Sequence, residues 1–256
     1  MGEIILSKVV VSGVQGLDEL ISGGFPDGRV ILVVGGPGTG KTIFASQFLY
    51  RGLNDYQENG VFVSLDESKD HYYSEMKNFG WDFKKAEEEE KFAFLDATRM
   101  ARASILKEKL YGEISVLRGK QLPIDKLVEE LETKIHQIDA KRVGLDTLAT
   151  LIYRFPDPVE RRIAVVDLFE SLSELGVTTI ITTELSRLSL DRSVSIEEYL
   201  AHGVIMMQTL FSNGVMSRAL QVEKMRGVKI STNLVPYTID RNGIEVFPDL
   251  KLFGRT

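Results

Sequence analysis

The sequence contains no cysteine, and its three histidines, His71, His136 and His202, are far apart along the chain. Without cysteine there is no disulfide framework, no thiol nucleophile and no zinc or iron–sulfur site built from thiolates. Scattered histidines do not predict a histidine-built metal site either. Any metal is therefore expected to be a hard cation bound by oxygen atoms.

Long apolar runs and an excess of positive charge are also missing. No stretch approaches the ~18 apolar residues that a membrane helix needs, and the N-terminus lacks the basic and apolar regions of a secretory signal. We therefore expect a cytoplasmic protein without a membrane span. The formal charge of -6 and the pI near 5.3 argue against coating nucleic acid through overall charge, although a local basic groove is compatible with them.

The 256 residues are 43% hydrophobic, enough for a full core. Short β-branched runs alternate with longer amphipathic segments, which predicts an α/β fold with a mostly parallel sheet flanked by helices. No linker or repeat divides the chain, so we expect a single domain over residues 1–256. The expected strands are Val30–Val34, Val61–Leu65, Arg142–Leu145, Val177–Thr183 and Val204–Met207, and the expected helices are Ile43–Arg51, Lys69–Phe79, Ile124–Ile138 and Val159–Leu175.

Two segments carry more detailed expectations. Apolar residues recur at helical spacing in the last of these helices, at Ile163, Val166, Leu168, Leu172 and Leu175. Beyond Arg218, two runs read as strands, Ala219–Met225 and Ile244–Phe247, and the Asn242-Gly243 pair is typical of a tight turn. We expect an antiparallel hairpin that closes the edge of the sheet.

A phosphate-binding loop is predicted between the first expected strand and helix, where residues 35–42 read GGPGTGKT. The glycines allow backbone N–H groups to turn inward, and the helix N-terminus adds partial positive charge. Lys41 is expected to reach the β- and γ-phosphates, and the Thr42 hydroxyl to bind Mg²⁺. A glycine-rich turn without a ligand is the alternative. The expected nucleotide contacts in this segment are Gly38, Thr39, Gly40, Lys41, Thr42 and Ile43.

Acidic residues follow three of the expected strands. Asp146 is a candidate second ligand for magnesium, with a helix cap as its alternative role. Asp66 and Glu67 follow Val61–Leu65, and neighbours in extended chain point to opposite faces. We assign Glu67 as the base that activates water and keep Asp66 in reserve. Glu184 is a third acidic candidate.

Lys224 and Arg226 are two residues apart in a strand-like run, so both side chains should lie on one face. Two cations on one face suit a clamp for phosphate, and an Arg finger is a known source of transition-state stabilisation. Solvated charges on an edge strand are the alternative reading.

Several motifs, in order along the chain, resemble RecA/RadA-superfamily ATPases of the KaiC type. The resemblance spans nearly the whole chain, and it implies a RecA-like P-loop ATPase domain. The segments that carry it, besides the P-loop, are Gly13–Leu20, Gly23–Pro26, Leu65–Glu67, Phe79–Asp82, Val177–Glu184, Glu197–Tyr199, Lys224–Gly227 and Val235–Pro248.

The resemblance implies more than the residues alone. ATP would lie between subunits of a ring, usually a hexamer, with Lys224, Met225 and Arg226 reaching the nucleotide of the neighbour. Asn78 and Phe79 would lie near the adenine, and core packing is the alternative for Phe79. The P-loop pattern and the resemblance both make Mg²⁺ an expected cofactor, and the resemblance makes ATP the expected nucleotide.

The chain also departs from the family pattern. His202 stands where the family usually has Asp, and Ile230 stands where clock KaiC has a nucleotide-contacting His. The Ser-Thr pair that clock KaiC phosphorylates on itself falls at Glu198-Tyr199. We therefore expect no autokinase activity.

Three functions compete on this basis. The first is a ring-forming ATPase that couples nucleotide state to a protein partner. The second is an ATPase that binds single-stranded DNA, with Leu185–Ser195 as the candidate loop because it carries Arg187 and Arg192; no stacking aromatic accompanies these cations. The third is a nucleotide-gated scaffold with weak hydrolysis. The residues themselves leave ATP and GTP as alternatives.

Overall fold

The computed structural model describes residues 8–98, 123–153, 155, 157–185, 194–212, 215–250 and 252. Its elements are β1 (Val9–Val10), α1 (Leu17–Leu20), β2 (Phe25–Pro26), β3 (Val30–Gly35), α2 (Lys41–Asp55), β4 (Gly60–Ser64), α3 (Lys69–Lys77), α4 (Phe83–Glu88), β5 (Phe92–Asp96), α6 (Pro123–Ile138), β6 (Arg142–Asp146), α7 (Leu148–Ile152), α8 (Pro158–Glu174), β7 (Thr178–Glu184), α9 (Ile196–Leu200), β8 (Gly203–Ser212), β9 (Val215–Met225), β10 (Val235–Asp240) and β11 (Gly243–Val246).

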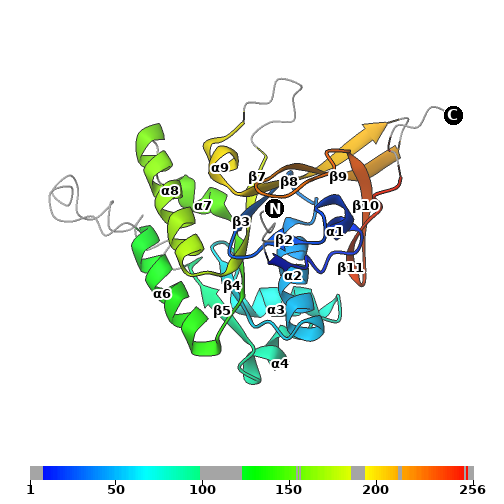
Figure 1. The fold of residues 1–256 in the computed structure, drawn as a ribbon. Coiled ribbons are helices and arrows are strands. Elements are labelled where there is room, and N and C mark those ends of the chain that lie inside the picture. Colours follow the sequence, from blue (N-terminus) through cyan, green and yellow to red (C-terminus); the bar gives the residue numbers. More distant parts are fainter. Residues whose placement is uncertain are drawn as a thin grey trace, which may run out of the picture.

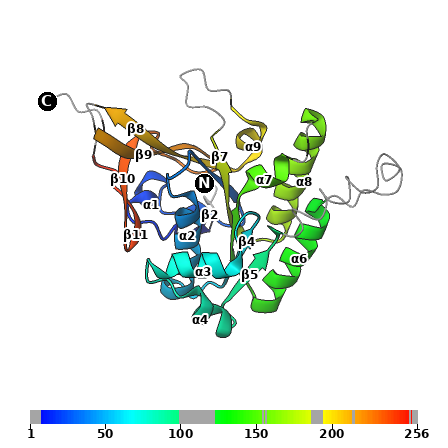
Figure 2. The same ribbon diagram turned by 180° about the vertical axis from the view of Figure 1, so that it is seen from behind.

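Nine strands form one sheet in the order β11-β10-β9-β8-β3-β7-β6-β4-β5. The strands from β8 to β5 are parallel, and the four strands from β8 to β11 pair antiparallel. Helices α6, α7 and α8 cover one face, and α2, α3 and α4 cover the other (Figures 1 and 2). The expected α/β fold with a mostly parallel sheet is confirmed.

Alternation along β3 divides the core into two layers. Ile31 and Val33 pack in the layer with α2, whereas Val30, Leu32 and Val34 pack in the layer with α8, and all five are fully buried. Because both faces of the strand are covered, its sequence is continuously apolar. In the strand order, β3 is the central strand, so its carboxyl end lies in the middle of the sheet.

The apolar stripe expected on α8 is buried in part. Leu168 and Leu172 are buried and Leu175 packs against the core, whereas Ile163 is 52% exposed. The buried face also includes Ala164, Val165 and Phe169, which the expected stripe did not contain. The helix carries apolar residues around most of its circumference, so the spacing alone allowed more than one buried face.

The C-terminal strands are antiparallel as expected, but their pairing differs. Ile244 pairs with Ile239 of β10, across the Asn242-Gly243 turn, and not with the strand at 219–225. That strand, β9, pairs with β8 and with β10. The unexpected strand β10 contains Pro236, a residue that argues against strand structure in a sequence.

Within the described part of the chain, no helix is long and apolar enough to cross a membrane.

Candidate nucleotide-binding site

The predicted phosphate loop connects the central strand β3 to α2. Gly38 and Gly40 have φ angles of 73° and 92°, the left-handed region that glycine adopts without strain. At Gly40 a Cβ atom would lie 2.5 Å from Cδ1 of Ile239, so the end of that side chain would have to shift to admit one. The hydroxyl of buried Thr39 donates to the Gly36 carbonyl at 2.8 Å, which closes the loop on itself.

Lys41 begins α2 and turns back over this loop. Its Nζ donates to the carbonyl oxygens of Gly35 at 2.9 Å and Gly36 at 3.1 Å. Burial lowers the pKa of Lys41, and the carboxylates of Asp146 and Glu184 oppose that shift. The ammonium group therefore lies inside the loop with two carboxylates near it.

Thr42 and Asp146 meet beside the loop. The Thr42 hydroxyl donates to Asp146 Oδ2 at 2.6 Å, and the Thr182 hydroxyl donates to the other carboxylate oxygen. A hydroxyl and a carboxylate are the oxygen donors that Mg²⁺ accepts beside phosphates and water. Among the described residues, no three His, Asp or Glu side chains gather closely enough to hold a metal by themselves. The donor set fits a magnesium ion shared with phosphates.

Glu67 lies in the turn that follows β4. Its backbone N–H donates to the Ser64 hydroxyl at 2.9 Å, which holds the turn after β4. Partial burial raises the pKa of Glu67, the carboxylates of Glu75 and Asp146 raise it further, and His71 opposes them. The field of Asp146 thus reaches Glu67.

Asp66 is placed differently. It is exposed, and its carboxylate accepts a hydrogen bond of 2.5 Å from the Thr150 hydroxyl of α7. Its neighbour Glu67 is only partly exposed. Both residues lie in a bend after β4, so the alternation of extended chain does not apply to them. Glu184 is exposed and pairs with Gly35 in the β3–β7 register, so its backbone adjoins the start of the loop.

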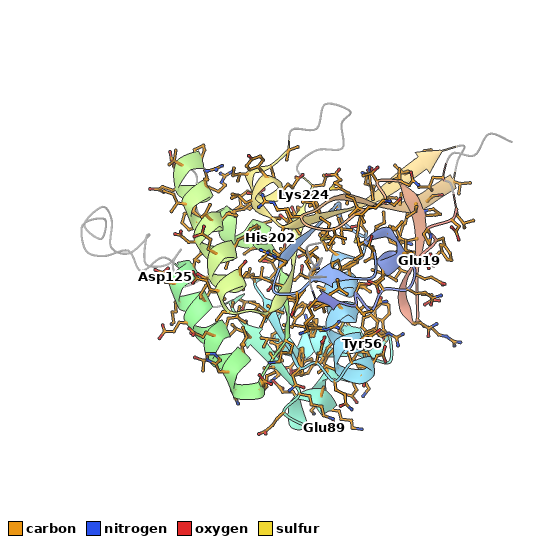
Figure 3. All side chains as sticks on the ribbon, viewed as in Figure 1. Glu19, Tyr56, Glu89, Asp125, His202 and Lys224 are labelled. Atoms are coloured by element: carbon orange, nitrogen blue, oxygen red, sulfur yellow. The ribbon has the colours of Figure 1, made fainter. Side chains whose placement is uncertain are left out.

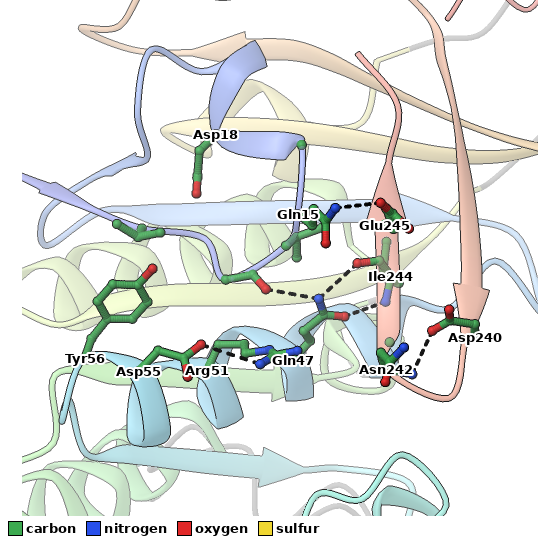
Figure 4. A pocket seen from close by; sticks show the side chains of 15 residues that line it. Gln15, Asp18, Gln47, Arg51, Asp55, Tyr56, Asp240, Asn242, Ile244 and Glu245 are labelled. Atoms are coloured by element: carbon green, nitrogen blue, oxygen red, sulfur yellow. Dashed lines mark hydrogen bonds and ion pairs between the residues drawn. The ribbon is translucent and has the colours of Figure 1, made fainter. Parts of the chain in front are cut away.

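Two buried polar residues near the loop and its helix were missed from the sequence. The Tyr237 hydroxyl of β10 donates to the Thr39 carbonyl at 2.6 Å from a buried position. Gln47 of α2 is also buried, and its amide donates to Gly13 and Ile244 carbonyls at 3.0 Å while accepting from the Ile244 N–H at 2.6 Å (Figure 4). Gln47 thus ties α2 to β11 and to the segment before α1, beside a polar pocket of about 350 Å³. No motif marks either residue, because their partners come together only when β10 and β11 lie beside α2 and the loop before it.

Lys224, which is labelled in Figure 3, and Arg226 lie toward the end of the central strands opposite the phosphate loop. Lys224 Nζ donates to the Glu198 carbonyl at 3.2 Å and to the Tyr199 carbonyl at 2.8 Å, and Arg226 Nη2 donates to the same Tyr199 carbonyl at 3.2 Å. Burial lowers the pKa of Lys224, and Arg226 lowers it further. Met225, between them, is buried, so its side chain belongs to the core.

His202 adjoins these two cations. The Arg226 N–H donates to the His202 carbonyl at 2.8 Å, and His202 Nδ1 accepts from the Val30 N–H at 3.3 Å. Burial lowers the pKa of His202, and Arg29, Arg226 and Lys224 lower it further. At this end of the central strands, Arg29, Lys224 and Arg226 therefore surround a histidine whose neutral form is favoured.

The residues expected near the adenine lie at the end of α3. Asn78 is the exposed C-cap of that helix. Phe79 is partly exposed and stacks on Trp81 with ring centroids 4.9 Å apart. Both readings of Phe79, packing and adenine contact, fit a half-exposed ring. Ile43 is likewise partly buried against the core.

Some expectations fall outside the described residues or away from the site. Arg187 and Arg192, the cations of the candidate DNA loop, lie outside the described residues. Ile230 packs against the core, in keeping with its lack of a polar group.

Comparison with known proteins agrees with this geometry. The family model described as "ATPase: KaiC" matches residues 10–251. A UPF0273 protein of Methanocaldococcus jannaschii is 38% identical, covering 94% of this chain and 97% of that protein. The circadian clock protein KaiC2 of Synechocystis is 35% identical over 93% of this chain but only 39% of its own length.

A solved structure extends the comparison to three dimensions. The crystal structure of a KaiC-like protein from the hyperthermophilic archaeon Pyrococcus horikoshii OT3 superposes with a TM-score of 0.78 and is 36% identical, covering 94% of this chain and 100% of that one. Family match, relatives and fold all agree with the resemblance inferred from the motifs. The chain belongs to the KaiC family of ATPases, and its P-loop sequence lies between β3 and α2.

Proposed function

We propose that this protein hydrolyses ATP with Mg²⁺ at sites shared between neighbouring subunits of a ring, a homohexamer by its KaiC resemblance. Nucleotide state would be passed to a protein partner in signalling or regulation, in the cytoplasm where ATP is available. Each site would combine the P-loop of one subunit with Lys224 and Arg226 of the next.

The separation of these two groups within one chain carries the proposal. Arg226 lies level with His202 and Val30, whereas the P-loop begins at Gly35. Five residues of β-strand separate the two levels, about 16 Å along the sheet. Lys224 is level with Leu32, about 10 Å from Gly35, and its Nζ points to the Glu198 and Tyr199 carbonyls. Both cations are therefore poorly placed to act on a nucleotide in their own P-loop, while a head-to-tail neighbour can present them to it.

The residues around the loop support hydrolysis as the chemistry. Lys41 would exchange its loop carbonyls for phosphate oxygens, and Thr42 with Asp146 would hold Mg²⁺, which neutralises charge on the phosphates. Glu67 would accept the proton of the attacking water, a role that its raised pKa suits. Lys224 and Arg226 would stabilise negative charge in the transition state from across the interface.

Light scattering with phosphate release tests both halves of the proposal. We expect Mg-ATP to raise the molar mass from that of a monomer or smaller oligomer to that of a ring. Glu67→Gln should bind nucleotide but lose turnover, whereas Asp66→Asn, a matched change one residue away, should retain most of it. A monomer in which wild type and Glu67→Gln hydrolyse ATP equally well would contradict both the ring and the base.

The same measurements separate the two competing functions. Turnover that rises several-fold with single-stranded DNA would favour the recombinase-like alternative. Tight Mg-ATP binding with negligible wild-type turnover would instead favour a nucleotide-gated scaffold.

A further inference from the structure

Helix α3 connects two parts of the proposed site. Glu67 precedes the N-cap of this helix, Ser68, and Asn78 is its C-cap. One short helix thus fixes both the proposed base and a residue expected near the adenine. What holds α3 against α2, the helix that carries Lys41 and Thr42, then matters to the chemistry. The inference below rests on the proposed function, and its test separates the two.

Tyr72 lies at the middle of α3 and is fully buried. Its ring stacks on Phe62 of β4 with centroids 4.1 Å apart and also lies near Phe83 and Phe94. Aromatic packing alone would be served by phenylalanine. A buried hydroxyl costs free energy unless it is hydrogen-bonded, so the direction of this hydroxyl is informative.

The Tyr72 hydroxyl begins a series of hydrogen bonds that ends at the magnesium ligands. Tyr72 Oη lies 3.0 Å from Ser46 Oγ, and Ser46 Oγ donates to the Thr42 carbonyl at 2.8 Å. Because the Ser46 hydroxyl proton is used in that bond, Ser46 Oγ is the acceptor of the hydrogen bond that the Tyr72 hydroxyl donates. The Thr42 hydroxyl in turn donates to Asp146.

The surroundings of the Tyr72 hydroxyl keep it protonated. Burial raises the pKa of Tyr72 well above its ordinary value, the Ser46 hydrogen bond opposes this, and the carboxylates of Asp146 and Glu67 raise it further. The fields of both carboxylates therefore reach this group. A neutral phenol is a permanent donor at any pH at which the protein is folded.

We propose that Tyr72 is a positioning residue that acts through Ser46. Together they hold α3, and with it Glu67, in place against the first turn of α2. A nucleotide bound at Lys41 and Thr42 then stiffens α3 as well as the loop, and the base stays at a fixed separation from the phosphates. Tyr72 itself touches neither nucleotide nor water.

Kinetics provide the first test. Tyr72→Phe keeps the stacked ring and removes only the donor, so kcat should fall roughly three- to tenfold while the dissociation constant of Mg-ADP stays within about twofold. Ser46→Ala should lower kcat similarly, and the double variant should lose no more than the larger single effect, because both break one series. Tyr73→Phe is the matched control in the same helix and should behave as wild type.

Hydrogen exchange provides a readout that needs no turnover. In wild type, Mg-ADP should slow exchange of the amides of both α3 and the first turn of α2. Tyr72→Phe should keep the slowing in α2 and lose it in α3. If Mg-ADP still slows exchange in α3 of Tyr72→Phe, the proposal is overturned. A variant that loses thermal stability and nucleotide affinity along with turnover would also overturn it, because that pattern marks a purely structural role.

Different results would contradict the proposed ATPase function and the positioning role of Tyr72. A wild type without ATPase activity, or an active Glu67→Gln, contradicts the proposed function, and hydrogen exchange still decides whether Tyr72 links the two helices. Conversely, an inactive Glu67→Gln beside a fully active Tyr72→Phe leaves the ATPase in place and removes the positioning role.

Discussion

The hydroxyl of Thr42 and the carboxylate of Asp146, 104 positions apart in the sequence, are joined by a hydrogen bond of 2.6 Å at the carboxyl edge of the sheet. One belongs to the P-loop helix and the other ends β6. Parallel strands place both at one edge. This meeting of a hydroxyl and a carboxylate is the structural basis for assigning a magnesium site.

Removing either donor should remove the benefit of magnesium for nucleotide binding. Thr42→Val keeps the shape of the side chain, and Asp146→Asn keeps its size, but each loses an oxygen donor for the ion. We expect the affinity for Mg-ADP to fall roughly 10- to 100-fold, with little change for ADP in EDTA. Isothermal titration with and without Mg²⁺ measures this. Thr150→Val, which loses a hydroxyl bonded to Asp66, is the control, and equal losses in both buffers would contradict the assignment.

The decrease of kcat/KM at acid pH should reflect protonation of Glu67. A base works when ionised, and burial with the nearby carboxylates of Glu75 and Asp146 raises its pKa, so kcat/KM should fall as pH drops through a value above the usual 4.5 of Glu. Glu75→Gln removes one of these charges and should move the limb to lower pH. His71→Gln removes the opposing group and should move it upward. An acid limb that neither change shifts would point to another group.

Tyr237 should affect the P-loop without touching nucleotide. Tyr237→Phe removes the hydrogen bond to the Thr39 carbonyl and leaves a buried acceptor unpaired, at a cost of roughly 1 to 3 kcal/mol. Part of that loss should appear as weaker nucleotide binding, since the carbonyl belongs to the loop. Chemical denaturation with and without Mg-ADP separates the two contributions. A variant with unchanged stability and unchanged affinity would show that the bond does not hold the loop.

A buried ion pair at the amino end of the parallel strands should contribute strongly to the free energy of unfolding. Arg142 is 1% exposed, bonds Glu58 Oε2 at 2.6 Å and donates to the Phe48 carbonyl at 2.9 Å. Glu58→Gln leaves this guanidinium without its partner, and we expect a loss of about 2–4 kcal/mol in the free energy of unfolding. Asp139→Asn, in the exposed pair with Lys141, should cost less than about 0.5 kcal/mol. Similar losses in both variants would contradict the account.

The sequence predicted the parallel strands of the sheet better than the antiparallel strands at its C-terminal side. Strands such as Val30–Val34 are buried on both faces, so a short continuous apolar run is sufficient to identify them. Strand β10, which lies between β9 and β11, was missed because it contains Pro236, although Val235, Tyr237 and Ile239 recur at strand spacing. The face of α8 was misjudged at Ile163 because apolar residues surround most of that helix.

At the site, local motifs were informative and long-range contacts were not. The P-loop and Asp146 follow from strand ends and spacing. Arg142 illustrates the limit, since nothing in its sequence neighbourhood indicates that a charge opening an apolar strand is fully buried against Glu58. Tyr72 and Ser46 likewise look like ordinary helix residues until α3 packs on α2.

The central claim is that each ATP site takes its cations from a neighbouring subunit, and mixing two inactive variants tests it directly. Lys224→Met retains an intact P-loop side with Glu67, and Glu67→Gln retains intact cations. In randomly mixed rings, about a quarter of the interfaces pair both intact sides, so turnover should recover to roughly a quarter of the wild-type rate. A mixture as inactive as its two components would contradict the shared site and place Lys224 and Glu67 at one site within a single chain.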